Sequence, residues 1–201
     1  MTKIAIIDYG LGNLRSVIRG LEKAGANAVI TCDAGEIASA DGLVLPGVGA
    51  FHEGMDQLGP LQETVVKSAR QVPLLGICLG MQMLLETSEE HGIHKGIGLI
   101  PGNARRFPRV PGQKVPHMGW NSLTIEKTDN PLFAGFKQDE YVYFVHSYYA
   151  DTLPEFTLTN TQYICPFASS VFKGNVFGVQ FHPEKSGATG LRLLKNFIGM
   201  V

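Results

Sequence analysis

The stretch Gly76-Ile77-Cys78-Leu79-Gly80 follows an apolar run at residues 72–75 and precedes a helix-compatible segment at residues 81–86. A strand that turns sharply into a helix, with a nucleophile at the turn, is a nucleophile elbow, and its glycines permit close packing and a strained backbone. We therefore expect Cys78 at a helix N-terminus, where the peptide dipoles favour a thiolate. A buried core cysteine is the alternative interpretation, because free cysteine is among the most buried residue types.

Short apolar strands alternate with helical segments around this elbow. One helix face is indicated by the spacing of Leu14, Val17, Ile18 and Leu21. The alternation predicts an α/β fold with a mostly parallel central sheet flanked by helices, to which the second half of the chain adds antiparallel strands. Sites in such sheets lie beyond the carboxyl ends of the strands. We expect strands at residues 4–8, 28–31, 42–45, 72–77, 140–146, 157–163, 168–172 and 175–181, and helices at residues 14–24, 61–70, 81–86 and 187–198.

Composition limits the class of protein. The 201 residues are 44% hydrophobic with a net charge of −1, which suits a single globular domain over residues 1–201 and offers no basic stripe for nucleic acid. We expect neither a secretory signal nor a membrane span, because no apolar run approaches roughly 18 residues. Cys32, Cys78 and Cys165 form no CxxC pair, so we expect a cytoplasmic protein with reduced thiols, in which Cys32 and Cys165 are ordinary core or surface residues.

A thiolate nucleophile needs a base that moves protons and a group that orients that base. The segment Gln180-Phe181-His182-Pro183-Glu184 offers both. An expected strand delivers His182 to a strand end, Pro183 ends the ladder, and Glu184 can turn back to fix the imidazole tautomer. A lone histidine is usually a satisfied core or surface residue, but this placement together with an elbow favours catalysis.

The loop Pro46-Gly47-Val48-Gly49 follows the expected strand at residues 42–45. A glycine-rich loop at this place can direct peptide N–H groups at a developing oxyanion, and the N–H of Leu79 would be a second donor. An ordinary strand-to-helix turn is the alternative, since Pro-Gly pairs are common in turns.

The order Cys78, His182, Glu184, with the glycine-rich loop upstream, resembles the triad-type (class I) glutamine amidotransferases. The resemblance implies that Cys78 attacks the side-chain amide of L-glutamine, that His182 shuttles protons, and that Glu184 holds His182. Glutamate and ammonia are the implied products, and no cofactor and no metal is implied.

Further site residues are carried over from the same family. The implied oxyanion hole is formed by Val48, Gly49 and Leu79. The implied substrate-binding residues are Gly47, Gln82, Ser147 and Tyr148.

Four more segments resemble one group within this family, the glutaminase subunits of a synthase in histidine biosynthesis. The resemblance runs from about residue 3 to the expected C-terminal helix, and it implies a heterodimer with a (β/α)8-barrel cyclase. Ammonia would pass to that partner by a shielded route, because ammonia is protonated in neutral water. The segments are Tyr9–Asn13, Leu45–Phe51, Pro116–Asn121 and Tyr143–Tyr148. The implied partner-facing residues are Asn13, Trp120, Tyr143 and Lys185.

Trp120 is the sole tryptophan of the chain. It would be a core aromatic residue in many proteins, but the neighbouring Gly119 and Asn121 indicate a loop. We favour a position at an interface, where tryptophan is enriched.

Three alternatives to this function remain. The first is another class I amidotransferase subunit, such as the anthranilate or GMP-forming type, which the Tyr9–Asn13 and Pro116–Asn121 segments disfavour. The second is a cysteine hydrolase that does not use glutamine, and the third is a non-catalytic module with the same fold. We also expect little activity from the free chain, with a peptide of the loop at residues 46–49 turning into place when partner and acceptor bind.

Other polar clusters carry no assigned function. His91 and His94 are expected in a solvated loop rather than at a metal. We expect a solvated helix end at Glu86, Glu89 and Glu90, and a surface insertion at residues 101–113.

Overall fold

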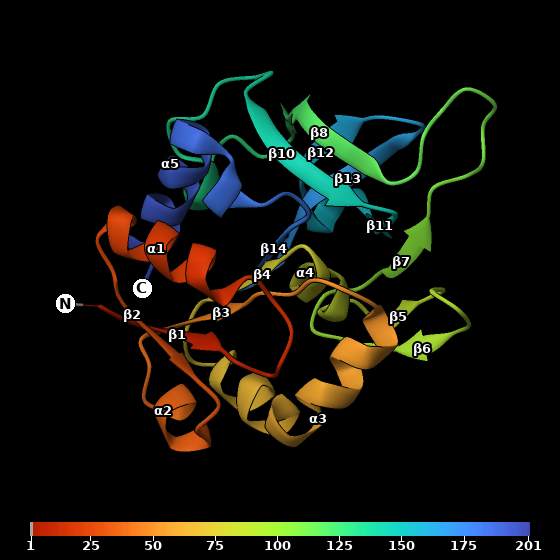
Figure 1. Cartoon of the computed structure of the whole chain (residues 1–201). Helices are drawn as coiled ribbons and strands as arrows, with labels where there is room; N and C mark the ends of the chain where they lie inside the picture. Colours follow the sequence, from red (N-terminus) through yellow and green to blue (C-terminus); the bar gives the residue numbers. More distant parts are fainter. Residues whose placement is uncertain (1) are drawn as a thin grey trace.

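A block of parallel strands forms the centre of the fold in the computed structural model, which describes residues 2–201 (Figure 1). The order within this parallel block is β2-β1-β3-β4-β14. Every residue of β3, β4 and β14 is buried, as expected for short apolar strands covered by helices on both faces. The strands are β1 (Lys3–Ile7), β2 (Asn27–Thr31), β3 (Gly42–Leu45), β4 (Leu74–Ile77) and β14 (Val176–Val179).

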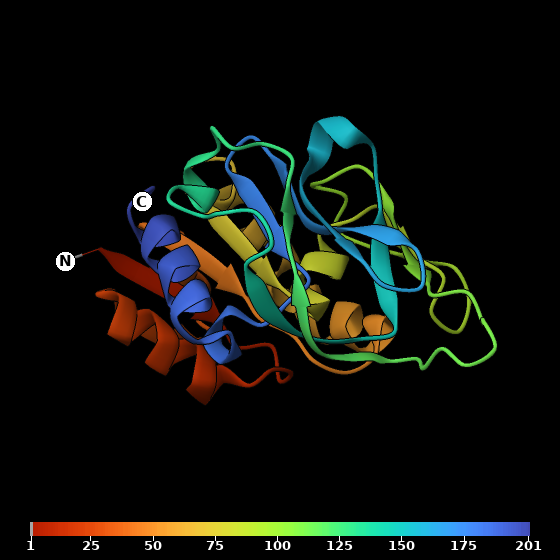
Figure 2. The ribbon, with the colours of Figure 1, turned by 90° about the horizontal axis from the view of Figure 1, so that it is seen from above.

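Helices cover both faces because successive residues of a strand point to opposite sides of the sheet. Ile4 and Ile6 of β1 belong to the core beneath α1 and α5, whereas Ala5 and Ile7 belong to the core beneath α2 and α3. Figures 1 and 2 show α1 and α5 side by side. The helices are α1 (Leu14–Ala24), α2 (Ala34–Ala38), α3 (Phe51–Ser68), α4 (Leu79–Met83) and α5 (Gly187–Ile198).

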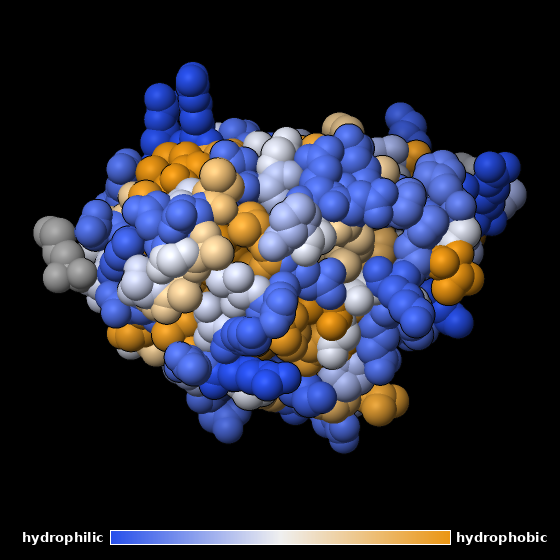
Figure 3. Space-filling view, turned by 90° about the horizontal axis from the view of Figure 1, so that it is seen from below, coloured by the Kyte–Doolittle hydropathy of each residue, from blue (hydrophilic) through white to orange (hydrophobic). Residues whose placement is uncertain are grey.

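The outer surface on the side of α2 and α3 is mostly hydrophilic, with hydrophobic residues in separate patches (Figure 3). Within residues 2–201, no helix is long and apolar enough to cross a membrane.

The remaining strands form the antiparallel half of the molecule, in which only the pair β5 and β7 is parallel among the described residues. Strand β13 pairs antiparallel with β14, and the large sheet continues through β11, β7, β5 and β6, while β12 pairs with β13 and β9. A separate two-stranded sheet is formed by β8 and β10. The bounds are β5 (Thr87–Ser88), β6 (His94–Lys95), β7 (Asn103–Arg106), β8 (His117–Ser122), β9 (Thr124–Ile125), β10 (Tyr141–His146), β11 (Tyr148–Asp151), β12 (Thr157–Gln162) and β13 (Pro166–Lys173). Short 3-10 helices are η1 (Pro131–Phe133), η2 (Pro154–Phe156) and η3 (Pro183–Lys185).

The predicted fold class is confirmed, but several elements differ from their predicted bounds. The helix predicted at residues 61–70 is the longer α3, because its buried side, which includes Phe51, Leu58 and Val65, continues past Pro60. The helix predicted at residues 81–86 is the shorter α4. Helix α2 was not predicted, since its 5 residues are too few for a periodic signal.

The surface insertion predicted at residues 101–113 is wrong for its first part. Asn103–Arg106 forms β7, which pairs with β11 and β5, and Ala104 is fully buried. Only the loop that follows β7 extends away from the body of the molecule, as Figure 2 shows in green.

Candidate active site

The elbow predicted at Cys78 is present in the structure. Strand β4 ends at Ile77, and Cys78 is the N-cap residue of α4 with φ 54° and ψ −108°. A positive φ is uncommon for a residue with a side chain and costs conformational energy. The neighbouring glycines make the turn possible, because a Cβ on Gly76 would lie 2.8 Å from the backbone nitrogen of Met81, and a Cβ on Gly80 would collide with the carbonyl oxygen of Leu45.

Strand β14 places His182 beside this turn, because β14 and β4 are parallel neighbours and their carboxyl ends meet. The backbone nitrogen of Cys78 donates to the carbonyl of Val179 at 2.8 Å. Beyond the strand end, the backbone nitrogen of His182 donates to the carbonyl of Tyr143 at 2.9 Å. The hydroxyl of Ser186 donates to the carbonyl of His182 at 2.6 Å and accepts from the backbone nitrogen of Tyr143 at 3.0 Å. The histidine turn is thus tied to β10.

Glu184 orients the imidazole of His182. Its Oε1 lies 2.7 Å from Nδ1 of His182, and both side chains are 2% exposed. The carboxylate therefore fixes the hydrogen on Nδ1. Nε2 has no hydrogen-bond partner among the described residues. Burial disfavours the charged ring, but Cys78 and Glu184 outweigh burial and raise the pKa of His182 to about 9. The geometry thus suits a base whose protonated form is stabilised.

A cavity of about 370 Å³ opens at this place and is large enough for a small molecule. It lies between the ends of β4 and β14, the loop after β3, and the turn between β10 and β11. The lining residues are Val48, Gly49, Cys78, Leu79, Gln82, Glu90, Pro116, Val145, His146, Ser147, Tyr148 and His182.

The structure brings most of the predicted site residues to this cavity. Gln82 donates from Nε2 to the carbonyl of Tyr148 at 3.0 Å, and the same nitrogen lies 3.2 Å from Oε1 of Gln180. Nε2 of Gln180 in turn lies 3.7 Å from Sγ of Cys78. Ser147 and Tyr148 line the wall at the start of β11.

Gly47 is not among the lining residues. A Cβ there would meet the hydroxyl of Tyr9 at 2.5 Å and the backbone nitrogen of Gly80 at 2.9 Å. The protein itself therefore fills the space that a side chain at position 47 would need, and substrate binding by Gly47 stays a prediction.

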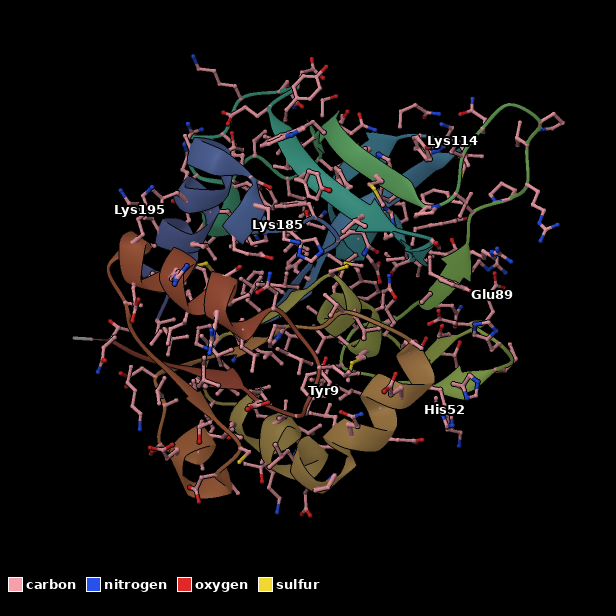
Figure 4. All side chains as sticks on the ribbon, viewed as in Figure 1. Tyr9, His52, Glu89, Lys114, Lys185 and Lys195 are labelled. Atoms are coloured by element: carbon pink, nitrogen blue, oxygen red, sulfur yellow. The ribbon has the colours of Figure 1, made fainter. Side chains whose placement is uncertain are left out.

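The loop at residues 46–49 is anchored from inside. The hydroxyl of Tyr9, a buried residue of the loop after β1, donates to the carbonyl of Pro46 at 2.7 Å, and Figure 4 shows Tyr9 in the interior. Burial, and then the charge of Cys78, raise the pKa of the Tyr9 hydroxyl, so it stays a hydrogen-bond donor. The N–H of Leu79 donates to the carbonyl of Gly47 at 3.4 Å, a long hydrogen bond that occupies an expected oxyanion donor.

The helix end predicted at Glu86, Glu89 and Glu90 is wrong, although Glu86 and Glu89 are exposed to solvent as expected. These residues flank β5, and their carboxylates accept backbone hydrogen bonds from Gly102 at 3.1 Å, Arg106 at 2.7 Å and Phe51 at 2.6 Å respectively.

Glu90 is a site residue that the sequence did not reveal. Its carboxylate caps the first residue of α3 and also lines the cavity. Since the strand before it has 2 residues, no local pattern could place Glu90 near Cys78.

Three of the four predicted partner-facing residues lie next to one another. Trp120 lies in β8 rather than in the loop that its neighbours indicated, and it is 56% exposed, so it is no core residue. Its ring contacts that of Tyr143 edge-on at 6.1 Å between centroids, and Nζ of Lys185 lies 6.0 Å from the Tyr143 ring. Asn13 is exposed and is the N-cap residue of α1, with no capping bond from its side chain within residues 2–201.

The described residues hold no group of three or more His, Cys, Asp and Glu side chains arranged for a metal ion. The ring of His94 instead stacks on that of His52 at 4.4 Å, and Figure 4 shows His52 toward the periphery.

The chain matches the family model of glutamine amidotransferase class-I over residues 5–200. It therefore belongs to the class-I glutamine amidotransferase family and is an enzyme of that kind, which confirms the resemblance drawn from the sequence. Its full-length relatives include the imidazole glycerol phosphate synthase subunit HisH of Methanosarcina mazei, at 54% identity over 100% of both chains. The protein of the same name from Archaeoglobus fulgidus is 46% identical over 98% of each chain.

Solved structures support the fold. One described as a glutamine amidotransferase has a TM-score of 0.75 at 18% identity and covers 98% of this chain and 97% of that chain. PurLQS from Thermotoga maritima has a TM-score of 0.73 at 20% identity, with 98% of each chain covered.

Proposed function

We propose that this chain is the glutaminase subunit of an imidazole glycerol phosphate synthase and acts in histidine biosynthesis. The observation that carries the proposal is the convergence of Cys78 and His182 on one cavity, with Glu184 bonded to the far side of the imidazole. The full-length relatives named as subunits of that synthase support the choice among amidotransferases.

Cys78 is the proposed nucleophile. Its thiol proton passes to Nε2 of His182, and Sγ bonds to the amide carbon of L-glutamine. His182 then gives the proton to the amide nitrogen, the C–N bond breaks, and ammonia leaves a γ-glutamyl thioester. Water attacks the thioester while His182 takes its proton and returns it to Sγ, which releases glutamate. Glu184 stabilises the imidazolium that forms twice in this cycle.

The cavity wall supplies the proposed recognition of glutamine. Gln82, Ser147 and Tyr148 line it, and Glu90 adds a carboxylate that suits the α-ammonium group. Val48, Gly49 and Leu79 are the proposed oxyanion donors, since all three border the cavity next to Cys78.

The proposed partner is a (β/α)8-barrel cyclase in a heterodimer. It would use the ammonia to form imidazole glycerol phosphate and aminoimidazole carboxamide ribonucleotide. Exposed apolar side chains on the sheet of β8 and β10 support docking there, since Met118 is 63%, Trp120 56% and Tyr141 58% exposed. Tyr143, Lys185 and Asn13 complete the proposed contact surface.

Partner binding is also the proposed control of the loop at residues 46–49. The bond from Leu79 to the carbonyl of Gly47 keeps one oxyanion donor occupied in the free chain. A rotation of a peptide in that loop would free the N–H of Leu79 for the oxyanion. Until the partner binds and causes this rotation, the chain should hydrolyse little glutamine. Equal glutaminase rates with and without partner and acceptor would contradict this control.

Glutamate release from L-glutamine tests the proposal. The purified chain is assayed alone and then with a barrel cyclase and its ribonucleotide acceptor. Low activity alone and a large rise in the complex are expected. Stimulation by an anthranilate-type partner instead would assign the chain to another amidotransferase, and turnover of an aryl ester with no glutaminase activity in the complex would favour a different cysteine hydrolase.

A further inference from the structure

Two buried histidines at the cavity, one lining it and one behind it, take no part in the proposed triad. His117 of β8 and His146 of β10 face each other across the two-stranded sheet and are 3% and 5% exposed. Nδ1 of His117 lies 3.0 Å from Nε2 of His146, and Nδ1 of His146 lies 2.8 Å from the carbonyl oxygen of Tyr148. We refer to His117 and His146 as the histidine pair.

The hydrogen bonds of the histidine pair have one consistent direction. A carbonyl oxygen can only accept, so Nδ1 of His146 carries the hydrogen and its Nε2 accepts from Nδ1 of His117. Nε2 of His117 is then an acceptor, and Nδ2 of Asn121 lies 3.2 Å away as its donor. Both rings are neutral in this arrangement. Burial supports neutrality, because it lowers the pKa of His117 to about 4 and that of His146 to about 3.

Aromatic rings prevent the histidine pair from turning. The ring of His117 is stacked between Phe144 and Tyr163, with centroid distances of 4.8 Å and 4.0 Å. Phe107 packs at 5.2 Å from the ring of His146. The direction of the hydrogen bonds is therefore held by packing as well as by the partners.

The chain of hydrogen bonds continues from the histidine pair to the thiol. The carbonyl of Tyr148 also accepts from Nε2 of Gln82 at 3.0 Å, and that nitrogen lies 3.2 Å from Oε1 of Gln180. Gln180 is fully buried, so this contact sets which end of its amide faces Cys78. The result is an N–H donor 3.7 Å from Sγ, where it stabilises negative charge on the sulfur.

The bond from His146 to Tyr148 also shapes the cavity directly. It spans the turn between β10 and β11, with Ser147 at the apex. Both Ser147 and Tyr148 line the cavity, so a shift of the Tyr148 carbonyl moves the wall on which a substrate would rest.

We propose that His117 and His146 are positioning residues of the glutaminase reaction, which hold the Tyr148 carbonyl and, through Gln82 and Gln180, the donor that faces Cys78. This inference rests on the proposed function. A positioning role can be distinguished from a merely structural one. Loss of packing alone would lower stability, whereas loss of positioning would change both the KM for glutamine and the rate at which the Cys78 thiol reacts.

Three variants in the complex with cyclase and acceptor test the inference. His146→Leu removes both ring nitrogens, and kcat/KM for glutamine should fall about tenfold, with a higher KM and a slower alkylation of Cys78 by a glutamine-like chloroketone. His146→Asn keeps an N–H donor at the position of Nδ1, so kcat/KM for glutamine should stay close to the wild-type value. Phe133→Leu removes an equally buried aromatic ring that packs on Phe136, outside the aromatic cluster of the histidine pair, and should lower the melting temperature while kcat/KM stays within about twofold.

Each outcome is decisive. If the wild-type complex fails to hydrolyse glutamine, the proposed function falls. If the wild type is active and His146→Leu matches it, or if Phe133→Leu loses as much kcat/KM as His146→Leu, the positioning role is overturned. Should His146→Leu not fold, two-bond ¹H–¹⁵N spectra of the histidine-labelled wild type decide. Both rings should carry hydrogen on Nδ1 alone between pH 6 and 8, and a charged ring or an Nε2–H tautomer of His146 overturns the inference.

Discussion

Cys78 and His182 follow neighbouring strands of the parallel block, yet the elbow around Cys78 and the turn around His182 hold their side chains by different means. Cys78 is placed by backbone shape, with φ 54° between two glycines at which neighbouring backbone atoms leave no room for a Cβ. His182 is placed by polar groups, since Glu184 holds its ring and both Tyr143 and Ser186 hold its backbone. Steric placement does not change with pH, whereas polar placement depends on protonation and on β10, which carries part of the proposed partner surface.

The largest effect is expected from removing the thiol of Cys78, the side chain that is placed by backbone shape. Cys78→Ser keeps the shape of the turn but exchanges the sulfur for a poor nucleophile, so glutamine-dependent synthesis in the complex should fall by at least roughly 10³-fold. Synthesis driven by added ammonia should be unchanged. Loss of both activities would mean that this chain does more than make ammonia.

Gly80→Ala tests whether the turn depends on the absence of a side chain. Its Cβ would collide with the carbonyl of Leu45, and we expect the free energy of unfolding to fall by about 3 kcal/mol, measured by urea denaturation. Gly59→Ala is the matched control, because a Cβ at Gly59 meets nothing within 4 Å, and it should change stability by no more than about 1 kcal/mol. Similar losses in both variants would argue against steric placement.

Trp120→Ala probes the antiparallel half without touching the elbow. We expect binding to the cyclase to weaken by about 2 kcal/mol, as measured by titration calorimetry, because a large exposed aromatic residue at an interface is a typical hot spot. The stability of the free chain should be unchanged. Ile93→Ala removes another exposed hydrophobic side chain, 77% exposed and distant in sequence, and should bind normally. Equal effects of the two variants would contradict the proposed surface.

The most gradual effect expected is a pair of opposite pH dependences. The pKa of His182 is raised to about 9, so its stabilising contribution is complete below about pH 6.5 and is lost as pH rises through about 9. The pKa values of His117 and His146 are lowered to about 4 and about 3, so the unfolded chain binds protons that the folded chain does not, and stability falls as pH drops below about 6.5.

Urea unfolding at pH 5, 6.5 and 8.5 measures both dependences. Each histidine can contribute up to roughly 1.4 kcal/mol per pH unit. Glu184→Gln should flatten the alkaline side, and His146→Leu should flatten the acid side. If either variant keeps the wild-type slope on its own side, that histidine does not titrate as its surroundings indicate.

The sequence predicted the parts of the site that carry local signatures. The G-x-C-x-G turn and the His-Pro-Glu segment each fix a strand end and a reactive side chain within five residues, and parallel pairing of β4 with β14 brings the two together. Glu90 and the histidine pair could not be predicted in this way. Their surroundings depend on β5 and on the pairing of β8 with β10, where residues 29 positions apart become partners.

The fold also divides into elements with a local sequence signal, which were predicted, and elements that depend on pairing with distant strands, which were not. Strands of the parallel block were predicted nearly at their observed bounds, because they are short and mostly apolar. Strand β7 was missed because Asn103–Arg106 has a polar sequence, and its place in the sheet comes from backbone pairing with β11 rather than from hydrophobic alternation.

The positive φ of Cys78 has a consequence for the history of such a protein. The conformation costs roughly 1–3 kcal/mol, and replacement by glycine would recover most of that cost at once. Natural selection must therefore defend this cysteine against a mutation that makes the chain more stable. In a duplicated gene released from catalysis, position 78 should be among the first to drift, and a glycine there would mark a copy that has kept the fold and given up the reaction.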